Sequence, residues 1–232
     1  GQHHQFGVEA IGDGEPAIDV EIIQLGWLVL QELGLSSLSL VVNSIGDMEC
    51  RPTYLKELKR YYANHLNKLC ADCKNRHERN PLRLLDCKQD GCQSIIAKAP
   101  HSVDYLCSPC KEHWNIFQGY LTSLGIPYKL DHRLVRGLDY YTRTVFEIQP
   151  PVEGSQSTLI GGGRYDGLIK EIGDRETPGV GFGSGLERII SNLIRQEVEV
   201  QIDTPRPIVI VPIGVEAVSY GVTLGAFLRS TG

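Results

Sequence analysis

The sequence predicts an α+β protein. Apolar residues recur at helical spacing in several segments, of which residues 17–33 are the first. Residues 144–148 and 158–160 are rich in β-forming side chains instead. A turn containing two prolines and a glycine separates these two runs, which is typical of an antiparallel hairpin. The chain has 232 residues, 41% hydrophobic and 22% charged, and this is the composition of an ordinary globular protein.

Two helices and a strand are predicted in the first part of the chain. Residues 17–33 should form a helix that ends at Gly34, with one apolar face made of Ile18, Ile22, Leu25, Val29 and Leu33. Residues 38–42 alternate like a strand. Pro52 begins the second helix, whose predicted apolar face consists of Tyr54, Leu58, Tyr61, His65 and Leu69.

A cysteine-rich segment from Cys70 to Cys110 separates this part from a third predicted helix, which ends near Gly125. The apolar face of the third helix consists of Trp114, Phe117, Leu121 and Leu124. After the hairpin, residues 180–183 should form a glycine-rich strand, and residues 184–196 should form a helix.

The last segment is predicted to be the start of another domain. Pro205 and Pro207 are typical of a linker. Residues 208–213 are predicted to be a buried strand, and residues 215–229 the helix after it. One strand and one helix are too little to fold alone, so we expect the chain to be truncated at its C-terminus.

Charge is distributed unevenly along the chain. The formal net charge is −5, yet the segment from Arg51 to Arg83 has nine basic residues and three acidic ones. A basic lobe on an acidic body can bind a polyanion, although a solvated helix surface explains the same pattern. No apolar run is long enough to cross a bilayer and the N-terminus is polar, so we expect a cytoplasmic protein with no membrane contact.

The seven cysteines are an odd number, which fits poorly with a disulfide framework. The spacing contains Cys70-x2-Cys73, Cys107-x2-Cys110 and Cys87-x4-Cys92. Two such pairs suit a tetrahedral structural zinc ion, with Cys50 left over. The alternative is a set of free thiols, and the sequence does not say which four cysteines would hold a metal.

Four segments contain side chains suited to chemistry. In residues 5–9, strand alternation places Gln5 and Glu9 on one face, which would suit a zwitterionic ligand. Residues 136–147 combine an arginine, two tyrosines and two acids around a glycine. Residues 159–168 contain three successive glycines that allow a ligand close to the backbone, and residues 181–188 are a glycine-rich strand followed by a helix start and Arg188. Taken singly, each segment also has an ordinary explanation as an edge strand, a hairpin entry, a loop or strand-to-helix packing.

In this order, the four segments resemble the histidyl-tRNA synthetase family of class II aminoacyl-tRNA synthetases. Residues 136–147 resemble the family's histidine-binding motif, residues 181–188 class II motif 3, and residues 4–9 the end of motif 2. Residues 80–86 resemble the family's insertion domain. The resemblance implies an antiparallel sheet flanked by helices, with a mostly helical insertion domain that contacts the tRNA acceptor end.

The resemblance also implies roles for particular residues. Five would bind histidine, namely Gln5, Glu9, Arg136, Tyr140 and Tyr141. Arg136 would also be the catalytic cation beside the α-phosphate, and Arg188 would hold the tail of ATP. The implied activity is that of a histidine–tRNA ligase, which activates L-histidine with ATP and Mg²⁺ and transfers it to tRNA(His), as a homodimer in the full-length protein. The alternatives are a non-catalytic paralogue that senses histidine or uncharged tRNA, and a zinc-stabilised tRNA-binding module.

The implied domains are a catalytic core over residues 1–50, a helical insertion over residues 51–130, the remaining core over residues 131–204 and the start of an anticodon-binding domain over residues 205–232. The family's dimer motif and the upstream part of motif 2 are not in this sequence. We therefore expect the chain by itself to be inactive.

Overall fold

The computed structural model describes residues 2–137, 140–151, 158–173, 175–199 and 207–231. The chain divides into two compact units, Gly1–Val198 and Glu199–Gly232. The finer division into core, insertion and anticodon-binding segments stays a prediction. Within the described ranges, no helix combines the length and the apolar character that crossing a membrane requires.

The first unit is built around a six-stranded sheet in the order β1-β6-β5-β4-β2-β3. The strands are β1 (Gln5–Ile11), β2 (Ser39–Ser44), β3 (Tyr128–Leu130), β4 (Thr142–Gln149), β5 (Ile160–Arg164) and β6 (Gly179–Gly185). All neighbouring pairs are antiparallel except β2 and β3, and the predicted hairpin is the β4–β5 pair. The predicted antiparallel sheet flanked by helices is confirmed.

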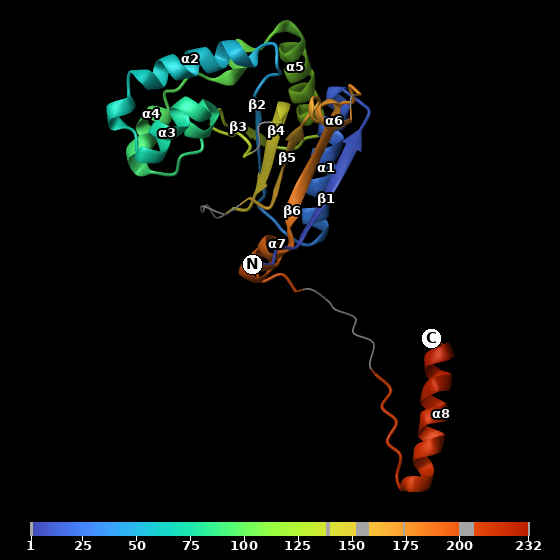
Figure 1. The fold of residues 1–232 in the computed structure, drawn as a ribbon. Helices are drawn as coiled ribbons and strands as arrows, with labels where there is room; N and C mark the ends of the chain where they lie inside the picture. The colour runs from blue at the N-terminus through green and yellow to red at the C-terminus, as the bar shows by residue number, and fades with distance from the viewer. Residues whose placement is uncertain (1, 138–139, 152–157, 174, 200–206, 232) are drawn as a thin grey trace. The chain divides into compact units, whose positions relative to one another are not determined.

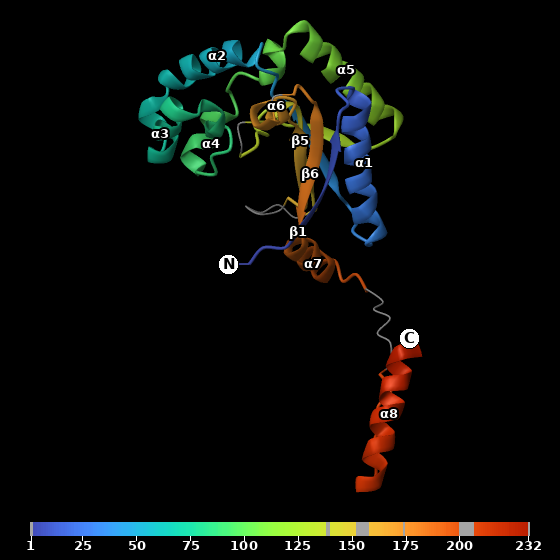
Figure 2. The same ribbon diagram turned by 45° about the vertical axis from the view of Figure 1, so that its right-hand side comes forward.

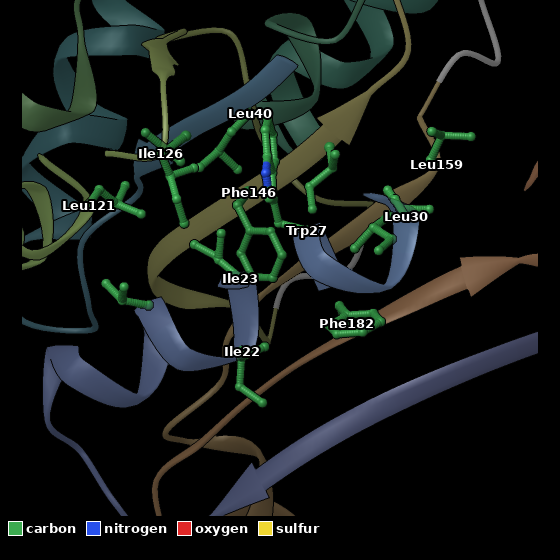
Figure 3. Close-up of a cluster of buried hydrophobic side chains, with 14 of the residues drawn as sticks. Ile22, Ile23, Trp27, Leu30, Leu40, Leu121, Ile126, Phe146, Leu159 and Phe182 are labelled. Carbon is green, nitrogen blue, oxygen red and sulfur yellow. The ribbon is translucent and has the colours of Figure 1, made fainter. Parts of the chain in front are cut away.

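One face of this sheet is apolar and covered by two helices, α1 (Pro16–Glu32) and α5 (Ser108–Ser123). Alternate residues of the strands, such as Phe146 of β4 and Phe182 of β6, point into this core. Figure 3 shows them against Ile22, Ile23, Trp27 and Leu30 of α1. The helix lies so close to the sheet that a Cβ on Gly26 would be 2.9 Å from Cδ1 of Ile160. The opposite face is therefore the one that remains for a ligand.

A buried polar network lies inside this core. Asp19 of α1 is 0% exposed and accepts hydrogen bonds from Thr144 of β4 (2.6 Å), from His113 of α5 (2.7 Å) and from the buried guanidinium of Arg164 of β5. Burial by itself would raise the pKa of Asp19, but the hydrogen bond from His113 and the charge of Arg164 outweigh it, so this pKa lies below its usual value. One carboxylate thus joins two helices to two strands.

The first part of the predicted insertion, residues 51–105, is a helical lobe beside the sheet (Figures 1 and 2), whereas α5 and β3 of the predicted range pack with the sheet. We call this lobe the insertion. Its elements are α2 (Arg51–Ala63), η1 (Leu66–Lys68), α3 (Ala71–Arg79), η2 (Pro81–Leu84), α4 (Asp90–Ile96) and η3 (Ser102–Tyr105). A separate apolar cluster holds it together, with Tyr54, Leu58, Tyr62 and Ile96 at its centre. Because α2 ends at Ala63, the predicted face is wrong in its last turns: Tyr62 is buried in place of Tyr61, and His65 and Leu69 lie beyond the helix.

Three further helices complete the description: α6 (Leu168–Gly173), α7 (Leu186–Arg195) and, in the second unit, α8 (Val215–Thr231). The predicted strand over residues 208–213 is wrong. Those residues form no strand, and Ile208 and Ile213 are 76% and 88% exposed. Their apolar pattern lacks a partner strand within the described part of this unit, and a single strand cannot satisfy its backbone hydrogen bonds.

Candidate active site on the glycine-rich face of the sheet

A floor of glycines lies on the uncovered face of the sheet. Gly161 of β5 pairs with Gly183 of β6, and Gly163 pairs with Gly181. Polar side chains lie directly over them: a Cβ on Gly161 would be 2.7 Å from Nη1 of Arg136, and a Cβ on Gly181 would overlap the carboxylate of Glu9. Only glycine leaves room for such groups to lie flat on the sheet.

The edge strand β1 supplies two polar side chains to this face. Gln5 and Glu9 lie opposite Gly185 and Gly181, so the predicted common face is confirmed. Nε2 of Gln5 would be 2.6 Å from a Cβ on Gly183. The Glu9 carboxylate accepts a hydrogen bond from the hydroxyl of Tyr165. Burial, together with this hydrogen bond, raises the pKa of Tyr165, so the phenol stays protonated and remains a donor to Glu9.

Across the glycine floor, Arg136 is fixed by an ion pair with Glu147 of β4. The distance from Nη1 to Oε1 is 2.8 Å, and the two side chains are only 22% and 17% exposed. The other oxygen of Glu147 accepts hydrogen bonds from Oγ1 of Thr158 at 2.8 Å and from Nε2 of Gln149 at 3.0 Å. The buried Nε of Arg136 has no hydrogen-bond partner among the described residues.

Three tyrosines form the aromatic wall of the site. Tyr140 and Tyr141 are stacked at 4.6 Å, and Tyr140 meets Tyr165 edge-on at 6.0 Å. The guanidinium of Arg136 lies 5.7 Å from the centre of the Tyr141 ring. Burial and the hydrogen bond with Tyr141 raise the pKa of Tyr140 to about 12. The rings lie directly on the floor, because a Cβ on Gly163 would be 2.9 Å from Cδ1 of Tyr141.

Arg188 lies in the first turn of α7, and its side chain lies beside Gly185 at the end of the glycine floor. It is exposed, and its Nη1 donates to the carbonyl of Thr158 at 2.9 Å. Because Thr158 also donates to Glu147, which pairs with Arg136, the two arginines are connected through two residues, Thr158 and Glu147. Two cations on the same side of an open polar face form a site for an elongated anion.

Tyr165, Glu147 and Thr158 were not predicted as site residues. Strand alternation could have placed Glu147, because it lies on the same face of β4 as Val145 and opposite Gly161. Tyr165 follows the glycine triplet closely, but the contact with Glu9 spans 156 positions and has no local signal.

The insertion reaches this site at Gly137. Nη1 of Arg83, in the segment that resembles the family's insertion, would lie 3.1 Å from a Cβ on Gly137. Gly137 does not have a positive φ, so its backbone conformation does not require glycine. The lack of a side chain instead leaves room for Arg83. A cavity of about 480 Å³ is lined by Glu147 and Thr158 on the sheet side and by Asp86, Cys87, Lys88 and Gln93 of the insertion, and none of the six predicted site residues lines it. This volume is in the range of ligand-binding clefts.

The seven cysteines form two separate groups of metal-ligand type. In the first, the ligand atoms of Cys70, Cys73, Cys87 and Cys92 all lie within 4.8 Å of one another. In the second, the same holds for Asp47, Cys50, Cys107 and Cys110. The expectation that Cys50 would be left over is therefore wrong, and Cys107-x2-Cys110 does not share a site with Cys70-x2-Cys73.

In the first group, backbone amides point at the sulfurs. The N–H groups of Cys73, Cys70 and Gln89 approach the Sγ atoms of Cys70, Cys92 and Cys87 at 3.4, 3.4 and 3.5 Å. The sulfurs of Cys70 and Cys87 are 3.9 Å apart, and a tetrahedral zinc–thiolate site has an edge of about 3.8 Å. This group could hold a metal ion.

The chain is similar to known proteins in both sequence and structure. The sequence profile of the histidyl-tRNA synthetase family matches residues 2–189. A histidine–tRNA ligase of Dehalococcoides mccartyi strain 195 is 54% identical over 207 residues, which are 89% of this chain and 48% of that protein. The Halothermothrix orenii histidine–tRNA ligase is 46% identical over 231 residues, which are 100% of this chain and 55% of that protein.

Among solved structures, the crystal structure of apo Staphylococcus aureus histidyl-tRNA synthetase matches with a TM-score of 0.76 and 37% identity, over 100% of this chain and 57% of that one. The chain thus spans about half the length of the relatives that it matches. The profile match, these identities and the shared fold show that the chain belongs to the histidyl-tRNA synthetase family.

Proposed function

We propose that this chain forms the histidine site and part of the ATP site of a histidine–tRNA ligase. The supporting observation is the glycine floor, with Glu9 and Tyr165 at one side and the Arg136–Glu147 pair at the other. A small zwitterion with a planar ring fits between an acceptor and a cation, and the aromatic wall covers the ring.

In the proposed reaction, the carboxylate oxygen of L-histidine attacks the α-phosphate of ATP, which enters as its Mg²⁺ complex. The bond to the β-phosphate breaks, and the products are histidyl-adenylate and pyrophosphate. Arg136 supplies a fixed positive charge where negative charge shifts among the phosphate oxygens. Glu147 holds the guanidinium in place, so it does not need to reorganise during the step.

Histidine would be distinguished from other amino acids by polar contacts to its ring. Glu9, held by Tyr165, would accept a hydrogen bond from an imidazole N–H, and Gln5 would bind beside it on the same face. Tyr140 and Tyr141 would line the ring. Such a site rejects apolar isosteres strongly, because its own buried groups would be left unpaired. Arg188, exposed at the end of the floor, would hold the tail of ATP.

The amino-acid dependence of ATP–pyrophosphate exchange tests this proposal. We define the chimeric ligase as the H. orenii enzyme in which this chain replaces the matching 231 residues. Exchange that requires histidine and is not supported by the other amino acids is expected, with the unaltered H. orenii enzyme as reference. A folded chimera that binds ATP but shows no histidine-dependent exchange would contradict the proposal.

The basic surface of the insertion is proposed to contact the acceptor stem of tRNA(His). Lys56, Lys59, Arg60, Lys74 and Arg79 are exposed, whereas Arg76 is half-buried and donates to the carbonyl of Arg83 at 3.1 Å. The presence of both this surface and Arg136 favours the ligase over a regulatory paralogue. The proposed assembly is a cytoplasmic homodimer.

Charge reversal tests the proposed tRNA interface. The pair Lys59→Glu and Lys74→Glu in the chimeric ligase should weaken tRNA binding, because each lysine would neutralise a phosphate. The slope of log affinity against log salt should become shallower by about one unit for each phosphate that is no longer neutralised. Lys129→Glu, exposed on the edge strand β3, is the matched control and should change neither quantity much. Unchanged affinity in the double variant would remove the insertion from the tRNA interface.

We also propose that Cys70, Cys73, Cys87 and Cys92 hold a structural zinc ion in the insertion. The four cysteines come from the start of α3, the segment after η2, and α4, so a bound ion would tie these segments together and add to the folding free energy of the lobe. Cys70→Ser is expected to lose one zinc per chain and to lower the midpoint of thermal unfolding, measured by elemental analysis and circular dichroism. A variant that keeps its metal and its stability would contradict this assignment.

A further inference from the structure

The second cysteine group lies at the base of the insertion, where the chain crosses between the sheet and the lobe twice. Asp47 and Cys50 are in the turn between the end of β2 and the start of α2. Cys107 and Cys110 occupy the N-cap and the first turn of α5, where the chain returns. The two crossings are 60 residues apart in sequence and meet at one point through these four side chains.

The three thiols gather around the Asp47 carboxylate. Its Oδ1 lies 3.5 Å from Sγ of Cys50 and 3.9 Å from Sγ of Cys107, and its Oδ2 lies 2.9 Å from Sγ of Cys110. In a tetrahedral zinc site with thiolate and carboxylate ligands, the ligand atoms are separated by about 3.5–3.8 Å. Because all four ligand atoms lie within 4.8 Å of one another, small side-chain movements would bring them onto one ion.

The surroundings suit anionic ligands as well. The N–H of Asp47 points at Sγ of Cys50 at 3.4 Å, and the N–H groups of Glu49 and Cys50 point at Oδ1 of Asp47 at 3.0 and 3.3 Å. Nη2 of Arg143 is 3.7 Å from Oδ2 of Asp47. Such donors orient ligands and offset their negative charge around a metal.

Gly46 makes this geometry possible. Its φ is +67°, and a Cβ there would be 2.6 Å from Sγ of Cys50, so any other residue would strain the turn and displace the sulfur. The buried thiols of Cys50 and Cys110 face a carboxylate here and not an apolar core, which is an unusual place for structural cysteines without a metal.

From this arrangement we propose that Asp47, Cys50, Cys107 and Cys110 form a second, independent zinc site, which fastens both chain crossings at the base of the insertion. Three thiolates and one carboxylate are a donor set that selects zinc among the common divalent ions. The turn that contains Asp47 is also hydrogen-bonded to β4, the strand of Glu147. The N–H of Arg143 donates to the carbonyl of Gly46 at 2.7 Å, and the N–H of Ile45 donates to the carbonyl of Arg143 at 2.9 Å. The second ion would thus hold the lobe against the strand that follows Tyr141.

Zinc stoichiometry of the 232-residue chain tests the proposal. Protein produced with added zinc should contain two ions per chain by elemental analysis. Cys110→Ser and Cys70→Ser should each contain one, and the double variant should contain none. Ser108→Ala, exposed in the first turn of α5 between the two cysteines, is the matched control and should keep two. One ion in the wild type that Cys70→Ser removes and Cys110→Ser leaves in place would overturn the second site while sparing the first.

A measurement on the unmodified chain covers the case in which the variants fail to fold. A mercurial that titrates the seven thiols should release two equivalents of zinc into a colorimetric chelator. Replacement by Co²⁺ should give the thiolate charge-transfer band and the visible bands of tetrahedral cobalt at two equivalents. Release or saturation at one equivalent, or a disulfide between Cys107 and Cys110 in freshly isolated protein, would overturn the proposal.

Discussion

Replacing Arg136 by alanine in the chimeric ligase is expected to lower the rate of histidyl-adenylate formation by orders of magnitude, with a much smaller change in the histidine KM. Removing one preorganised donor from a developing charge costs roughly 100- to 1,000-fold in rate, and a full positive charge should cost at least as much. Glu147 keeps its hydrogen bonds from Thr158 and Gln149, so the loss should be catalytic and not structural. Pre-steady-state adenylation and histidine KM, measured together, separate the two effects.

Gly161→Ala is the companion variant, because it displaces the guanidinium without removing it. Its Cβ would lie 2.7 Å from Nη1 of Arg136, at the far end of a flexible side chain. The adenylation rate should fall between those of the wild type and Arg136→Ala. Gly185→Ala, on the same face, has no atom within 3.4 Å of its Cβ and should behave like the wild type. Adenylation near the wild-type rate in Arg136→Ala would make this residue structural.

The largest effect on stability is expected from Asp19→Ala in the 232-residue chain. The substitution removes one of the two carboxylates that pair with the 0% exposed guanidinium of Arg164, and Asp166 remains as the other. It also leaves Thr144 and His113 without the acceptor that they share. Breaking a buried ion pair from one side typically costs about 3–5 kcal/mol. Urea unfolding, followed by circular dichroism, measures the free energy of unfolding.

Glu21→Ala is the control, because Glu21 is exposed on the same helix. Its free energy of unfolding should stay within about 0.5 kcal/mol of the wild type. The folded pKa of Asp19 lies below its unfolded value, so its contribution to stability is present above the unfolded pKa and is lost as the pH falls through the folded pKa. The difference between wild type and Asp19→Ala should therefore shrink in strong acid. A difference below about 1 kcal/mol at neutral pH would contradict this account of the core.

Local patterns in the sequence predicted the elements whose partners are near in the chain. The helix over residues 17–33 is α1, and the hairpin is β4–β5. The predicted apolar face of α1 is wrong, because Leu25 and Leu33 are exposed and the buried side chains include Ile23, Trp27 and Leu30. Residues 208–213 have the composition of a buried strand, but they are a strand only if another strand pairs with them. The buried face of α2 includes Tyr62 in place of the predicted Tyr61. Packing against the core of the lobe decides which side is buried, and the local sequence pattern does not contain that information.

The same holds for the site, where only the arrangement of residues close together in the chain could be predicted. Alternation along β1 was enough to place Gln5 and Glu9 together. The Tyr165–Glu9 bond and the partition of the cysteines depend on contacts between distant segments. Spacing alone grouped Cys107-x2-Cys110 with other pairs and left Cys50 aside, whereas the fold brings Cys50 and Asp47 to the start of α5. The roles of Gln5, Glu9, Arg136, Tyr140, Tyr141 and Arg188 in binding remain proposals.

The proposed function requires histidine to bind on the glycine floor with its ring against Glu9. The histidine KM of Glu9→Gln in the chimeric ligase tests this, because glutamine can still accept from Tyr165 but lacks the charge. A hydrogen bond to a charged group contributes about 1.5–3 kcal/mol, so KM should rise by about 10- to 150-fold, while KM for ATP changes little. Glu21→Gln, exposed on the helix that covers the opposite face of the sheet, should leave both constants unchanged. A histidine KM in Glu9→Gln equal to that of the unmodified chimera would show that the histidine ring does not lie against Glu9.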